Sequence, residues 1–153
     1  MTKLLGKAAV VTGGARGLGR VFARRLADLG ADIAVLDIDL NAAQKFGETL
    51  DAETIDAELR LFSVRAMALE ADLADHAATL AAMDEIAHTL GRIDILVNTA
   101  GGLLTKREES FASIMPAQDL DRMLDVNLRT AINCSQAAIP HMKATGGGSI
   151  VNV

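Results

Sequence analysis

Short apolar runs alternate along this chain with stretches in which apolar residues recur every three or four positions. The runs span residues 8–11, 33–36, 66–69 and 93–97, and a further one begins at residue 149. We interpret these runs as strands, because largely apolar strands separated by helices are typical of a parallel sheet covered on both faces. The alternation therefore predicts an α/β fold.

The stretches between the runs have the spacing of helices. They cover residues 20–29, 41–50, about 55–62, 75–90 and 119–142, and the last is the longest. Gly91 is expected to end the fourth helix, and Pro140 to kink the last turn of the fifth. The expected apolar faces are Phe46 and Leu50 in the second helix; Ile55, Leu59 and Phe62 in the third; Leu80, Met83, Ile86, Ala87 and Leu90 in the fourth; and Leu120, Leu124, Leu128, Ala131, Ser135, Ala138 and Met142 in the fifth.

A glycine-rich turn joins the first strand to the first helix. Its sequence, residues 12–19, is Thr-Gly-Gly-Ala-Arg-Gly-Leu-Gly. Glycines allow positive φ angles and close backbone approach, and the start of a helix directs free N–H groups at an anion. No Gly-Lys-Ser/Thr follows, which disfavours a nucleoside triphosphate loop. The turn predicts a phosphate site, and a tight connection without a ligand is the alternative.

Asp37 ends the second strand, 18 residues after Gly19. A carboxylate at this place accepts hydrogen bonds from the hydroxyl groups of an adenosine ribose and repels a 2′-phosphate. Arg16 opposes this preference, because its guanidinium near the turn could pair with a phosphate. With Asp37 followed by Ile38, we favour NAD over NADP as the cofactor. The alternative is a solvated aspartate at the start of the next loop.

Composition narrows the range of partners. The 153 residues are 50% apolar and carry a net charge of −5, without a cluster of lysine or arginine, so nucleic acid is not an expected partner. No segment is long enough to cross a membrane. The single cysteine, Cys134, is compatible with a reducing cytoplasm, and we expect it to be a small buried side chain. His76, His88 and His141 have no metal-ligand spacing, so we expect no metal site.

Several segments, in the correct order, resemble the short-chain dehydrogenase/reductase family. They are the glycine turn, Asp72-Leu73, Asn98-Thr99-Ala100-Gly101, Asn127 and the segment 148–153. The resemblance implies a Rossmann-like doubly wound parallel sheet. It also implies cofactor-binding roles for Gly13, Arg16, Gly17, Leu18, Gly19, Asp37, Ile38, Asp72, Leu73, Asn98, Ala100 and Gly101. Thr99 departs from the asparagine of the family, which affects the expected hydrogen bonds of that segment. Asp72 as a helix cap, and Asn98 and Asn127 as ordinary structural residues, are the alternatives.

The resemblance also implies an activity, the transfer of hydride between nicotinamide and an alcohol or carbonyl substrate. Asn127 matches an asparagine that the family uses in a proton relay. The serine, tyrosine and lysine that complete the chemistry of the family lie beyond the fifth strand, and this chain contains no tyrosine. We therefore expect a single domain over 1–153, truncated at the fifth strand and incomplete on its C-terminal side, that is inactive alone.

Other interpretations stay open at this point. A natural short protein that borrows the missing elements from a partner is the alternative to a fragment. A non-catalytic dinucleotide-binding module and an epimerase-type enzyme are the alternative functions. The final strand is expected to be an apolar edge. The resemblance implies a homo-oligomer for the full-length protein, in which the apolar side of helix 119–142 meets a second subunit; the alternative is that this side simply covers the sheet. The segment between Asp37 and Asp72 is longer than the family usually shows, with no function assigned to the extra residues.

Overall fold

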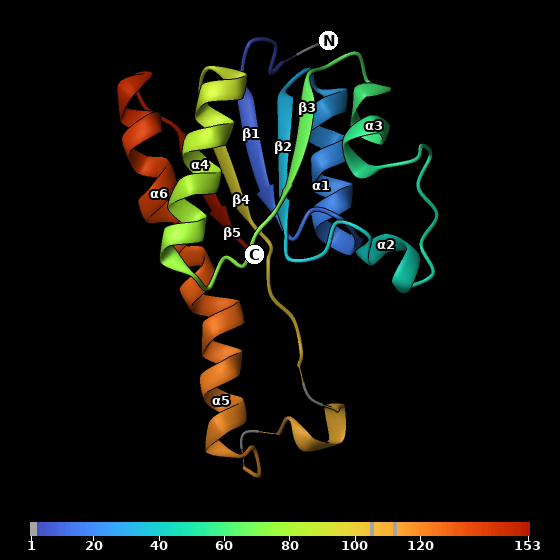
Figure 1. Ribbon diagram of the computed structural model, residues 1–153, viewed down its shortest axis with the longest axis vertical. Helices are drawn as coiled ribbons and strands as arrows, with labels where there is room; N and C mark the ends of the chain where they lie inside the picture. The colour runs from blue at the N-terminus through green and yellow to red at the C-terminus, as the bar shows by residue number, and fades with distance from the viewer. Residues whose placement is uncertain (1–2, 105, 112) are drawn as a thin grey trace.

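The computed structural model describes residues 3–104, 106–111 and 113–153. Its centre is a parallel sheet of five strands in the order β3-β2-β1-β4-β5 (Figure 1). The strands are β1 (Ala8–Thr12), β2 (Asp32–Asp37), β3 (Ala66–Glu70), β4 (Ile95–Asn98) and β5 (Ser149–Asn152). The predicted α/β, Rossmann-like doubly wound sheet is confirmed, with β5 at one edge.

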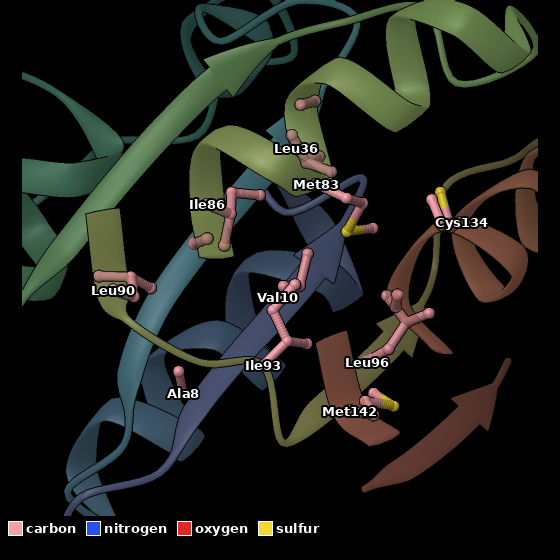
Figure 2. Packing of buried hydrophobic residues seen from close by; sticks show 14 of the residues in the cluster. Ala8, Val10, Leu36, Met83, Ile86, Leu90, Ile93, Leu96, Cys134 and Met142 are labelled. Carbon is pink, nitrogen blue, oxygen red and sulfur yellow. The ribbon is translucent and has the colours of Figure 1, made fainter. Parts of the chain in front are cut away.

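Helices cover the sheet on both faces, because successive side chains of a strand point to opposite sides. On one face, Val10, Leu36 and Leu96 pack with residues of α4 (His76–Leu90) and α6 (Thr130–Ala144), as Figure 2 shows. On the other face, Val11 and Val35 pack with residues of α1 (Gly17–Asp28) and α3 (Ile55–Arg60). In the described ranges no helix is long and apolar enough to cross a membrane.

The bounds of α4 follow the signals in the sequence. Asp75 caps its start, because one carboxylate oxygen accepts hydrogen bonds from the amides of Ala77 and Ala78 at 2.8 and 3.1 Å. Gly91 ends the helix in the left-handed conformation, with a φ of 82°. The predicted helix 75–90 is confirmed, but Leu80 is 39% exposed and does not belong to the buried face. Thr79 takes that place, because its hydroxyl is bonded to backbone carbonyls inside the fold.

The prediction of one helix over residues 41–50 was wrong. α2 comprises only Ala42–Lys45, and Gly47, with a φ of 76°, follows its end. Phe46 is consequently 65% exposed instead of lying on a packed helix face. Leu50 still packs against the core, and the predicted third helix is present as α3.

The predicted long helix 119–142 is divided into three parts. They are α5 (Ala117–Leu124), a π-helical turn η2 (Asp125–Arg129) and α6, with a 3₁₀ turn η1 (Arg107–Glu109) before them. The expected stripe covers the sheet only in α6, where Ala138 and Met142 are buried. Leu120, Leu124 and Leu128 are about half exposed, because α5 projects beyond the sheet (Figure 1). Pro140 lies inside α6 without ending it.

Candidate functional site

A cleft of about 470 Å³ lies at the carboxyl ends of β1, β2 and β4, beside the start of α1. The predicted cofactor-binding residues line it, with the exception of Asn98. Its other lining residues were not predicted from the sequence and are Asp39, Ala42, Phe46, Ala71, Thr99, Leu104, Val126 and Thr130. Most of these residues are apolar or small, so the sequence carries no chemical signal that singles them out.

Two glycines of the turn allow it to lie directly against the end of β4. Gly13 has a φ of 62°, and a Cβ atom on it would come within 2.9 Å of the Ala100 Cα atom. A Cβ atom on Gly19 would collide with the carbonyl of Gly13 and with the Thr99 hydroxyl. Because side chains are absent there, the backbone itself forms the floor of the cleft.

Thr99, which departs from the pattern of the resembled family, supplies hydrogen bonds of its own. Its hydroxyl donates to the carbonyl of Thr12, and its amide donates to the Thr12 hydroxyl at 3.1 Å. The Thr12 hydroxyl also accepts a hydrogen bond of 3.0 Å from the amide of Ala100. The end of β4 is therefore tied to the end of β1 just before the glycine turn.

Asp37 is fixed in orientation by backbone donors. Its two carboxylate oxygens accept hydrogen bonds from the amides of Ala15 and Asp39, at 3.0 and 3.2 Å. A carboxylate has about four acceptor positions, so this half-buried group keeps acceptor capacity for hydroxyl groups in the cleft. Its position next to the glycine turn agrees with the prediction from the sequence.

A second carboxylate, that of Asp39, lines the same part of the cleft. Its hydrogen bond of 2.6 Å from the ammonium group of Lys45 lowers the pKa of Asp39 and outweighs the effect of desolvation. Its position two residues after Asp37, just beyond the end of β2, was the one signal for it in the sequence.

The start of α1 is occupied by an acidic side chain from a distant loop. The amide of Gly17 donates to the carboxylate oxygens of Glu48 at 2.9 and 3.2 Å. Arg20 donates to the same carboxylate at 3.3 Å and also to the fully buried carboxylate of Glu58. Burial raises the pKa of Glu58, but the hydrogen bonds and charges of Arg20 and Arg24 contribute to a larger shift in the opposite direction. The pKa of Glu58 is therefore lowered. The contact between Gly17 and Glu48 joins residues far apart in sequence, and no local pattern could have revealed it.

Arg16 points from the glycine turn to the aromatic ring of Phe46. The guanidinium carbon lies 3.8 Å from the centroid of the ring, which is a cation–π contact. Both residues line the cleft, and the ring comes from the residue directly after α2. Figure 1 shows α2 beside the first turn of α1, which brings the two side chains together.

Asn98 and Asn127 support the cleft from outside. Asn98 is buried and donates hydrogen bonds to the Asn152 side chain at 2.8 Å and to the Ser135 hydroxyl at 3.3 Å, which ties β4 to β5 and α6. Asn127 lies in η2, where its side chain exchanges two hydrogen bonds with the backbone of Gly102, of 2.9 and 3.1 Å. A Cβ atom on Gly101 would lie 2.5 Å from the Asn127 side-chain oxygen.

Asp72 and Leu73 line the cleft from the segment that follows β3. Leu73 is 4% exposed, and the Asp72 side chain accepts a hydrogen bond of 2.9 Å from the amide of Ala74. Elsewhere, Cys134 is buried in the core, and burial raises the pKa of its thiol to about 12. Within 3–104, 106–111 and 113–153 no three His, Cys, Asp or Glu side chains are grouped as metal ligands.

The arrangement suits an elongated ligand. One part of the cleft presents carboxylates to hydroxyl groups, and the neighbouring glycine turn presents backbone, although Glu48 already engages the amide of Gly17. Much of the remaining lining is apolar.

Comparison with known proteins identifies relatives over the whole cleft-forming region. The family model of the short chain dehydrogenases matches residues 7–153. Cyclohexanol dehydrogenase of Rhodococcus sp. (strain TK6) is 38% identical over 153 residues, which cover 98% of this chain and 57% of that protein. The chain thus spans about half the length of the relatives that it matches.

Solved structures agree with this result. The structure of NAD+-bound xylitol dehydrogenase has a TM-score of 0.83 and 30% identity, and the match covers 98% of this chain and 53% of that one. A 7α-hydroxysteroid dehydrogenase complexed with NADH and 7-oxo glycochenodeoxycholic acid has a TM-score of 0.81 and 32% identity, with coverage of 99% and 54%. At these identities the similarity extends beyond the fold to a shared family.

Proposed function

Since the chain belongs to the short-chain dehydrogenase/reductase family, we propose that it is the coenzyme-binding part of an NAD-dependent oxidoreductase that acts on an alcohol or a carbonyl compound. The observation that carries the choice of NAD is the orientation of the Asp37 carboxylate. It is held by the amides of Ala15 and Asp39 at the end of β2, beside the glycine turn. A carboxylate so placed accepts hydrogen bonds from the ribose hydroxyls and repels a 2′-phosphate.

The residues of the cleft fit a nicotinamide dinucleotide. Gly13 and Gly19 let the turn lie directly against β4 and both line the cleft, where a glycine backbone allows a pyrophosphate to approach closely. Ile38, which is 68% exposed, and the largely buried Leu73 both line the cleft and offer apolar atoms to a flat adenine ring. NAD+ or NADH is present in two of the structural relatives, which supports the assignment without distinguishing NAD from NADP for this chain.

When bound, a nicotinamide coenzyme supplies the hydride acceptor or donor of the reaction. In this chain, Asn127 fixes the position of the backbone beside the cleft by two hydrogen bonds with Gly102. We propose for Asn127 the proton-relay role that its family counterpart has. The 153 residues include no tyrosine, so we propose that the acid–base groups of the family are not supplied by these residues and that the chain alone is inactive.

The test is to titrate the purified protein separately with NADH and with NADPH and to measure binding by the fluorescence of the coenzyme. We expect tighter binding of NADH, and we expect Asp37→Ala to narrow that preference by weakening the binding of NADH and relieving the repulsion of the 2′-phosphate. Equal or tighter binding of NADPH by the parent protein would refute the role of Asp37.

A non-catalytic dinucleotide-binding module is the second candidate, and the absence of tyrosine favours it. Assays of the purified protein in which this chain occurs, with NAD and a panel of secondary alcohols, separate the two functions. Turnover by the protein in which this chain occurs supports the enzyme, whereas coenzyme binding without turnover supports the module.

We further propose that the protein in which this chain occurs is a homo-oligomer of the cytoplasm. The half-exposed leucines along α5 and η2 support an interface between copies, and the single, buried Cys134 thiol supports a reducing compartment.

A further inference from the structure

The glycine turn carries one cation, the guanidinium of Arg16. Arg16 directly follows Ala15, whose amide donates a hydrogen bond to the Asp37 carboxylate. A guanidinium next to the Asp37 carboxylate would form an ion pair with it, because arginine and carboxylate pair strongly. Among the described residues Arg16 forms no ion pair with Asp37 or with Asp39, although all three line the cleft. Its guanidinium instead lies over the Phe46 ring.

The position of Phe46 is set by contacts that hold its loop against the first helix. Gly47, with a φ of 76°, turns the chain directly after the ring. Glu48 then accepts hydrogen bonds from the amide of Gly17, and the carbonyl of Thr49 accepts one of 2.8 Å from Arg20. The ring is thus attached through its neighbours to the same turn that carries Arg16.

The charges of this corner also disfavour a phosphate unless Arg16 takes part. Asp37 and Asp39 present two carboxylates, and the ammonium group of Lys45 is engaged by Asp39 at 2.6 Å. A 2′-phosphate bound beside Asp37 would add two negative charges there. Among the described residues that line the cleft, Arg16 carries the one positive charge that could compensate them, and its guanidinium lies over the Phe46 ring.

We propose that Phe46 is a coenzyme-specificity residue, whose ring retains the Arg16 guanidinium and so withholds it from the 2′-phosphate of NADP. The inference rests on the proposed binding of a nicotinamide dinucleotide in this cleft. It assigns a function to one residue of the segment between Asp37 and Asp72, which was expected to be longer than the family usually shows. Phe46 acts through Arg16 and does not itself discriminate between the coenzymes.

The experiment is a double-mutant cycle on the ratio of the dissociation constants of NADPH and NADH. The variants are Phe46→Leu, Arg16→Ala and the combination of both, each titrated with both coenzymes at one ionic strength. Effects of the ring on adenine cancel in the ratio, because the two coenzymes differ only in the 2′-phosphate. Phe111→Leu is the matched control, since Phe111 is 60% exposed against 65% for Phe46 and does not line the cleft.

We expect Phe46→Leu to lower the ratio about two- to fivefold, the size of one exposed cation–π contact. Arg16→Ala alone should change the ratio little, and the double variant should return to the parent value. Phe111→Leu should leave the ratio unchanged. Phe46 is largely exposed, so circular dichroism should show that its replacement leaves the fold intact.

Two results would overturn the inference while NADH preference persists. The first is that Phe46→Leu leaves the ratio of the NADPH and NADH dissociation constants unchanged. The second is that Arg16→Ala changes this ratio as much in the parent protein as in the Phe46→Leu variant. Failure of the proposed function has a different signature. A parent protein that binds neither coenzyme, or that prefers NADPH, overturns the NAD assignment and with it the preference that Phe46 is proposed to enforce.

Discussion

Single residues at the two ends of the sheet have different tasks in this molecule. At the carboxyl ends of the strands, Asp37 faces the cleft with acceptor capacity left over. At the opposite ends, the buried carboxylate of Asp94 is fully engaged, because it accepts hydrogen bonds from Lys7, from Arg92 and from the amide of Ala8. Both aspartates end or begin a strand, so only their surroundings distinguish a binding group from a structural one.

Asp94 makes stability depend on pH in the acidic range. Burial raises its pKa, but the hydrogen bonds from Arg92, Ala8 and Lys7 outweigh burial and lower the pKa to about 2. Because the folded value lies below the unfolded one, the carboxylate stabilises the fold above about pH 4 and ceases to do so as the pH falls towards 2.

We expect Asp94→Asn to remove about 2 kcal/mol of this contribution at pH 7 and much less at pH 2.5. Urea unfolding at both pH values measures the difference. Asp84→Asn is the control, because the Asp84 side chain is 71% exposed. A loss of the same size at both pH values would mean that the charge of Asp94 is not the cause.

Alanine substitutions at Gly13 and Gly17 distinguish the cost of backbone strain from that of a steric collision. Both have a positive φ, of 62° and 56°, but a Cβ atom meets the backbone of Ala100 only at Gly13. We expect Gly17→Ala to cost about 1 kcal/mol and Gly13→Ala at least about 2 kcal/mol, with loss of coenzyme binding in the second variant. Thermal unfolding and NADH titration measure both. Equal destabilisation by the two variants would contradict the close contact between the turn and β4.

At the scale of elements, the segment between β2 and β3 is held on α1 by a network of charges. Glu58 of α3 is fully buried between Arg20 and Arg24 of α1, and it also accepts a hydrogen bond from the amide of Asp51. The network attaches to the glycine turn through Glu48. A short helix and an irregular loop are therefore held firmly on α1, next to Phe46, which lines the cleft.

Removing the charge of Glu58 should loosen the attachment of this segment to α1. We expect Glu58→Gln to destabilise the fold by about 3 kcal/mol, because it leaves two arginines without their buried partner. The exposed Glu53→Gln in the same segment is the matched control and should change little. Urea denaturation measures the loss, and a result equal to the control would show that the network contributes nothing to stability.

The helical region 117–144 shows how an element can be predicted while its surroundings are not. The apolar spacing indicated one continuous helix, and helical residues do run from α5 through η2 to α6. The five-residue π turn at Asp125–Arg129 cannot be recognised from spacing, yet it holds Asn127 against Gly102. It also lies where the helix leaves the sheet, which is why the predicted apolar stripe is buried in α6 alone.

At the scale of the whole molecule, the described residues expose a row of leucines on α5 and η2, namely Leu120, Leu124 and Leu128. Exposed apolar patches favour association. This row is the physical basis of the proposed homo-oligomer.

Leu128→Arg should therefore weaken association of the purified protein and shift its mass in light scattering towards that of a single copy. Leu61→Arg is the control, because Leu61 is 64% exposed and follows α3 on the other side of the sheet. If both variants keep the mass of the parent, the leucine row is not the interface.

The sequence by itself determined the alternation of strands and helices, the glycine turn and Asp37, because each depends on a local pattern: apolar runs, glycine spacing and a carboxylate at a strand end. The helix bounds at Asp75 and Gly91 were readable for the same reason, since caps are made by neighbouring residues. The sequence also supplied the family resemblance, which rests on several such patterns in order.

Only the tertiary structure decided which distant groups meet. Glu48 at the amide of Gly17, Phe46 under Arg16 and Asp94 between Lys7 and Arg92 all join side chains through the packing of separate elements. Such contacts leave no periodicity in the chain, because their partners are brought together by the order of strands in the sheet. The local patterns located the cleft, whereas the packing around it set the charges and surfaces that a ligand would meet.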